Sequence, residues 1–154
     1  MGWAPCGWLF PEQFVKFWTQ PSSVEKVRQA LTKRGVSKVS YYEDAAVFHL
    51  RCSDIGQYDE GQLALYTKQA AMLITQCAAC NRLVVSWCGS HHGGGEIETP
   101  GAHCSQMSIL VQTILEEETR LPAPVECWGL KETWDVFYSA ALLVGTTGKK
   151  GCSV

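Results

Sequence analysis

Cysteine and histidine residues gather in one stretch of the chain, from Cys77 to Cys104. This stretch holds four of the eight cysteines and three of the four histidines. Thiolates and imidazoles bind soft metal ions, and the same groups act as nucleophile and general base in covalent catalysis. The stretch therefore raises two chemical hypotheses, a zinc site and a cysteine-dependent hydrolase.

The spacing Cys77-x-x-Cys80 is typical of structural zinc ligands. A tetrahedral site needs a second pair of ligands, which would come from Cys88, His91 or His92, and Cys104. Against zinc, Cys77 and Cys80 fall in the last turn of a predicted helix, and Cys often packs as a small hydrophobe. A thioredoxin-type redox role is disfavoured too, because that chemistry stabilises the thiolate at a helix N-terminus. We therefore expect no cofactor, with zinc as the alternative.

The sequence His92-Gly93-Gly94-Gly95 resembles the oxyanion-hole loop of the lipase and esterase branch of the α/β-hydrolases. Glycines in that loop let backbone N–H groups point at a developing oxyanion. The nucleophile motif of that fold, G-x-S-x-G, is absent from all 154 residues. The chain therefore lacks the nucleophilic serine motif with which an oxyanion-hole loop acts in that fold.

A strand, a histidine loop and a later strand that ends near a cysteine resemble the layout of caspases and metacaspases. This resemblance implies Cys127 as the nucleophile and His91 or His92 as its general base. The cysteine motif of that family, Q-A-C-x-G, is replaced here by Val-Glu-Cys-Trp-Gly. No complete catalytic set is found, so an enzyme is the alternative hypothesis rather than the favoured one.

Hydrophobic periodicity and helix-end signals indicate the elements that must position these residues. Predicted helices cover residues 11–18, 23–34, 62–80, 105–120 and 132–144. Predicted strands cover residues 36–42, 45–52, 83–87 and 125–130. The helix over 62–80 is expected to turn Leu63, Tyr66, Ala70, Leu73 and Cys77 toward the core, with Ile74 as a further candidate. His49 is expected on the solvent face of its strand, alternating with Phe48 and Leu50.

The order of these elements predicts an α/β fold, a single-domain layered sandwich of about four strands covered by helices. Residues 36–42 and 45–52 are expected to form an N-terminal antiparallel hairpin, with parallel strands after it. The domain is expected to span residues 11–144. An irregular segment, 1–10, precedes it, and a flexible tail, 145–154, follows it.

Charge and aromatic content favour protein partners. The formal net charge is −2, only 18% of residues are charged, and no Lys/Arg stripe indicates a nucleic-acid track. Six tryptophans are present, and tryptophan is enriched at interface hot spots. The segment 1–10 has no helical or strand period, so its aromatic residues Trp3, Trp8 and Phe10 are the expected partner-binding residues.

The sequence shows neither the pattern of a signal peptide nor that of a membrane span, and these patterns bear on the cell compartment. The N-terminal sequence shows no basic and then apolar pattern typical of a signal peptide. No run reaches the roughly 18 apolar residues of a membrane span. We therefore expect reduced thiols and an intracellular protein, cytoplasmic or organellar, that is neither secreted nor membrane-spanning.

These observations together favour a non-enzymatic subunit or adaptor of a larger protein assembly, which binds other protein subunits through aromatic and apolar surface. The alternative is a cysteine-dependent hydrolase or a zinc-binding protein that uses the stretch Cys77 to Cys104 and Cys127.

Overall fold

The computed structural model describes residues 21–50, 59–87 and 102–146. The chain divides into two units, Met1–Ser37 and Lys38–Val154. The described helix of the first unit is α2 (Pro21–Lys33). It ends one residue before the predicted end, where Gly35 adopts a left-handed φ of 79° and the N–H of Val36 bonds to the carbonyl of Leu31 at 3.1 Å.

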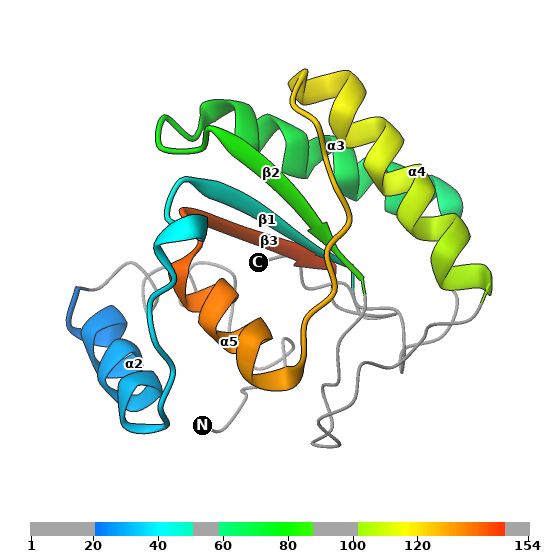
Figure 1. The fold of residues 1–154 in the computed structure, drawn as a ribbon. Coiled ribbons are helices and arrows are strands. Elements are labelled where there is room, and N and C mark those ends of the chain that lie inside the picture. Colours follow the sequence, from blue (N-terminus) through cyan, green and yellow to red (C-terminus); the bar gives the residue numbers. More distant parts are fainter. Residues whose placement is uncertain (1–20, 51–58, 88–101, 147–154) are drawn as a thin grey trace. The chain divides into compact units, whose positions relative to one another are not determined.

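The second unit is built on a sheet of three parallel strands in the order β2-β1-β3 (Figure 1). These strands are β1 (Ala45–Leu50), β2 (Arg82–Ser86) and β3 (Leu142–Thr146). The central strand β1 pairs with a neighbour on both sides, and five of its six residues are buried. Its apolar sequence, Ala-Ala-Val-Phe-His-Leu, fits a strand that is covered on both faces.

Helices cover both faces of this sheet (Figure 1). On one face, α3 (Glu60–Gln76) and α4 (Ala102–Thr119) share a core with Phe48 and Leu50. On the other face, α5 (Leu130–Ser139) and the short 3₁₀ helix η1 (Ser40–Tyr42) pack with Ala45 and Val47. The alternation of side chains along β1 therefore divides the unit into two cores.

The chain order explains why the helices divide in this way. From β1 the chain passes through α3 to β2 on one side, whereas β3 joins the other side of β1. Because parallel crossovers are right-handed, a reversal of direction along the sheet moves the connecting helix to the opposite face. The reversal lies between β1 and β3, and α5, which precedes β3, lies on the opposite face from α3.

The predicted α/β fold with a helix-covered sheet is confirmed, but the predicted N-terminal antiparallel hairpin is wrong. Residues 36–42 form no strand and instead end in η1. The predicted hairpin would place Asp44 in its turn. Instead, the backbone carbonyl of Asp44 accepts the N–H groups of Asn81 and Arg82, at 2.8 and 3.3 Å. The entry to β1 is therefore tied to the entry of its parallel neighbour β2.

The C-terminal half also differs from the prediction. The expected strand over 125–130 is reduced to one parallel bridge between Val85 and Val125, so the described residues hold three strands and not about four. The expected helix over 132–144 ends at Ser139, and β3 follows it. The N–H of Ala141 bonds to the carbonyl of Ala45 at 3.0 Å, so pairing with β1 overrides the helix propensity of this segment.

A hydrogen-bonded chain links η1 to the segment between α4 and α5. The indole Nε1–H of Trp128 donates to the hydroxyl of Tyr42 at 3.1 Å. That hydroxyl donates to Oε2 of Glu126 at 2.7 Å. Burial first, and then the bond to Glu126, raises the pKa of Tyr42 to about 12.

The close approach of β3 to β1 predicts that Gly145→Ala destabilises the unit. A Cβ at Gly145 would lie 2.9 Å from the backbone oxygen of His49. We expect the free energy of unfolding in urea to fall by about 1–3 kcal/mol, as overpacking usually costs. Gly129→Ala is the control, because the nearest atom to its Cβ is 4.0 Å away. Equal effects of the two substitutions would contradict this account.

The raised pKa of Tyr42 predicts a loss of stability at high pH. The unfolded chain releases this proton near its ordinary pKa of about 10, whereas the folded chain keeps it to about 12. The proton is then held more tightly by the folded state, so stability falls as pH rises between these values, by about 1–3 kcal/mol. Urea unfolding at pH 9.5 and 11.5 should show a smaller fall for Tyr42→Phe than for wild type. Tyr41→Phe is the exposed control and should keep the wild-type fall.

Candidate functional site

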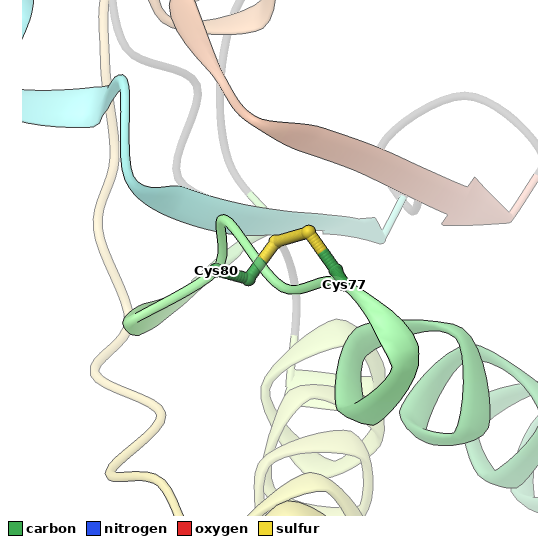
Figure 2. Close-up of a disulfide and its surroundings, with 2 residues drawn as sticks. All are labelled: Cys77 and Cys80. Carbon is green, nitrogen blue, oxygen red and sulfur yellow. A yellow bond between two sulfur atoms is a disulfide. The ribbon is translucent and has the colours of Figure 1, made fainter.

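The Cys77-x-x-Cys80 pair lies at the turn between α3 and β2, where the two sulfurs are bonded to each other (Figure 2). Cys77 caps the end of α3 with extended backbone angles, and its N–H bonds to the carbonyl of Ile74 at 3.1 Å. The helix therefore ends at Gln76, four residues before the predicted end. As a disulfide, this pair offers no thiolates to zinc.

The other described cysteines are also disulfide-bonded, and this differs from the reduced thiols expected from the sequence. They are Cys104, which is buried in α4, and Cys127, which is exposed before α5. A nucleophilic cysteine needs a free thiolate, so the hydrolase role of Cys127 applies only to a reduced form.

Several predicted site residues lie outside the described part of the chain: Cys88, His91, His92, Trp3, Trp8 and Phe10. Their roles stay predictions. Within residues 21–50, 59–87 and 102–146, no three His, Cys, Asp or Glu side chains are placed to hold a metal ion together. In the same ranges, no helix has the length and apolarity that crossing a membrane requires.

The carboxyl ends of the strands bring one polar row together on the face covered by α5. His49 of β1 is in register with Ser86 of β2 and with Gly145 of β3. This is the edge at which parallel α/β sheets commonly bind ligands. The sequence predicts His49 on the solvent face of its strand, and this prediction is wrong. His49 is half-buried and its ring meets Phe137 of α5 edge-on at 5.0 Å.

Ser86 is the most unusual member of the row. It is fully buried, and its Oγ has no hydrogen-bond partner among the described residues. A serine nucleophile would need a hydrogen bond to a base, and the described structure gives Ser86 none. The edge thus supplies a buried hydroxyl but no activated nucleophile.

The outer face of α3 is the most distinctive surface of the described chain. Leu65, Met72 and Leu73 are 56%, 61% and 51% exposed. At 3.6 residues per turn, Met72 projects within about 20° of Leu65 and Leu73 about 80° away from it, so the three side chains lie on the same half of the helix. We call them the α3 outer face. Leu73 was expected in the core but is exposed, whereas Ile74, the further candidate, is buried and 2% exposed.

Neutral side chains surround this apolar face. Gln62, Gln69 and Gln76 follow the same side of α3 at seven-residue spacing, and all are exposed. The charged residues of α3 are only Glu60 and Lys68. Meanwhile the opposite side of the helix buries Leu63, Thr67, Ala70, Ala71 and Ile74. The outward side of α3 thus mixes large apolar side chains with uncharged polar ones, while its other side is buried in the core.

Two buried serines, Ser139 and Ser86, are expected to respond differently when each is replaced by alanine. Ser139 accepts the N–H of Val39 at 2.7 Å and donates to the carbonyl of Asp135 at 2.6 Å. Ser139→Ala should lower the free energy of unfolding by about 1–3 kcal/mol, because the part-buried N–H of Val39 loses its partner. Ser86→Ala should leave stability unchanged or raise it slightly, since its hydroxyl has no partner to lose. Urea unfolding measures both, and a loss at Ser86 equal to that at Ser139 would contradict this assignment.

Comparison with known proteins finds no family model, no curated protein and no solved structure that matches this chain.

Proposed function

We propose that this protein is a non-enzymatic subunit that binds another protein chain through the α3 outer face. The observation that carries the proposal is the exposure of Leu65, Met72 and Leu73 together on one side of a helix whose other side is already in the core. Large apolar side chains gathered on a surface are typical of interaction sites.

The chemistry of this face fits a protein partner with an apolar, weakly charged surface. Charged residues are depleted at the centres of protein interfaces, and the α3 outer face is flanked mainly by glutamines. Met72 adds a flexible and polarisable contact, which suits a surface that adapts to a partner. Lys68 lies at the margin of the face and would meet an acidic group at the rim.

An enzymatic role has less support. The described cysteines are in disulfides, and the described hydroxyl at the sheet edge, Ser86, has no base bonded to it. The partner-binding role of Trp3, Trp8 and Phe10 stays a prediction beside the α3 outer face.

A triple substitution, Leu65→Ser with Met72→Ser and Leu73→Ser, tests the proposal. Burying each of these side chains in an interface is worth about 1.5–3 kcal/mol. We therefore expect a purified partner to bind the variant at least about 30-fold more weakly, which corresponds to about 2 kcal/mol. Titration calorimetry with the partner that co-purifies stoichiometrically with the full chain gives this ratio.

Ile109→Ser on α4 is the matched control, because Ile109 is 60% exposed on a different helix. It should keep wild-type affinity. The triple variant should also keep the wild-type unfolding midpoint, since its side chains are already exposed in the free chain. Unchanged affinity of the triple variant would refute the proposal, and so would loss of its fold.

A further inference from the structure

Three links close the turn between α3 and β2. The N–H of Cys77 bonds to the carbonyl of Ile74 at 3.1 Å, and the N–H of Cys80 bonds to the carbonyl of Cys77 at 3.0 Å. The third link is the disulfide between Cys77 and Cys80, which Figure 2 shows at the end of the helix. Ala78 and Ala79 between them are exposed. The disulfide is therefore the one covalent lock on a short surface turn.

The segments on either side are held without the sulfurs. On the helix side, Ile74 is buried in the core. On the strand side, the guanidinium of Arg82 donates to Oδ1 of Asp44 from Nε at 2.9 Å and from Nη2 at 2.6 Å. The backbone carbonyl of Asp44 also accepts the N–H of Asn81 at 2.8 Å. Opening the disulfide would therefore release the turn while α3 and β2 stay in place.

The two cysteines of this turn are also less buried than Cys104. Cys77 and Cys80 are half-buried, whereas Cys104 is 6% exposed. Cys80 packs against the core cluster, whereas Cys77 is not among the residues that pack against it. Access to the attacking thiol is a main determinant of exchange rate.

We propose that the Cys77–Cys80 disulfide is a thiol–disulfide exchange site that accepts two electrons from a dithiol. One thiolate of the dithiol attacks Sγ of Cys77, the S–S bond breaks, and the electron pair leaves on Sγ of Cys80, which takes a proton. The second thiol of the reductant then displaces Sγ of Cys77 from the mixed disulfide. The dithiol becomes a cyclic disulfide and both cysteines become thiols.

Reduction leaves only the two backbone hydrogen bonds to hold the turn. The amides of Cys77 and Cys80 then open to solvent more often, and the last turn of α3 loses its fixed end. Met72 and Leu73 lie just before this end. Exchange would thus loosen the turn that borders the α3 outer face, and its effect on a partner bound at this face rests on the proposed function.

Differential alkylation of the full chain tests the exchange. The folded protein is treated briefly with dithiothreitol at neutral pH, alkylated and digested, and each cysteine is quantified by mass spectrometry. We expect Cys77 and Cys80 to become alkylated at least about tenfold faster than Cys104. Rates equal to that of Cys104 would overturn the proposal. Free thiols at both positions in protein isolated without reductant would also overturn it.

Hydrogen exchange tests the release of the turn. On reduction, the amides of Cys77 and Cys80 should exchange about tenfold faster, while those of Val47 and Phe48 in β1 stay unchanged. The double variant Cys77→Ser/Cys80→Ser should exchange at the fast rate with or without dithiothreitol. Identical rates in oxidised and reduced wild type would refute the release. Failure of the α3 outer face to bind a partner would refute the proposed function but would leave both of these measurements standing.

Discussion

The burial of β1 on both faces and both edges is the constraint on which the rest of the second unit depends. Ala45, Ala46, Val47 and Leu50 have no exposed surface, and Phe48 is 1% exposed. A strand in this position needs a hydrogen-bonded neighbour on each side, because buried N–H and C=O groups left unpaired are costly. It also needs a helix layer on each face, which α3 with α4 and α5 provide. One side of α3 meets this requirement, and the other side of that helix keeps Leu65, Met72 and Leu73 exposed.

How far the sequence predicts this fold depends on how local the determinants are. The helices α2, α3 and α4 and the strand β2 carry their own periodicity, so the sequence predicts them to within a few residues at most ends. The strand β3 does not, since Ala-Ala-Leu-Leu-Val after a helix looks like more helix. Only its pairing with β1, and the close approach of Gly145 to His49, make this segment a strand. The predicted hairpin is wrong for the same reason, because the residues that pair with β1 come from 37 and 96 residues further along the chain.

The candidate site also combines features that are visible in the sequence with features that depend on the folded chain. The cysteine pair at 77 and 80 is visible in the sequence by its spacing, but the disulfide and the end of the helix depend on the folded turn. The α3 outer face was harder to predict. Leu73 and Ile74 are adjacent apolar residues, and their sequence does not say which one the core takes. The sequence does carry one indication of the α3 outer face. The helix has few charged residues over its 17 positions, which is unusual for a helix with one solvent-exposed face.

The central claim is that the α3 outer face binds a protein partner, and site-specific photo-crosslinking measures this directly in the cell. A benzoylphenylalanine at position 72, the most exposed residue of the face, is compared with one at position 113, on the exposed side of α4. The account predicts one discrete adduct from position 72, mapped by mass spectrometry to a single partner protein, and none from position 113. No adduct from position 72, or the same adducts from both positions, would contradict it.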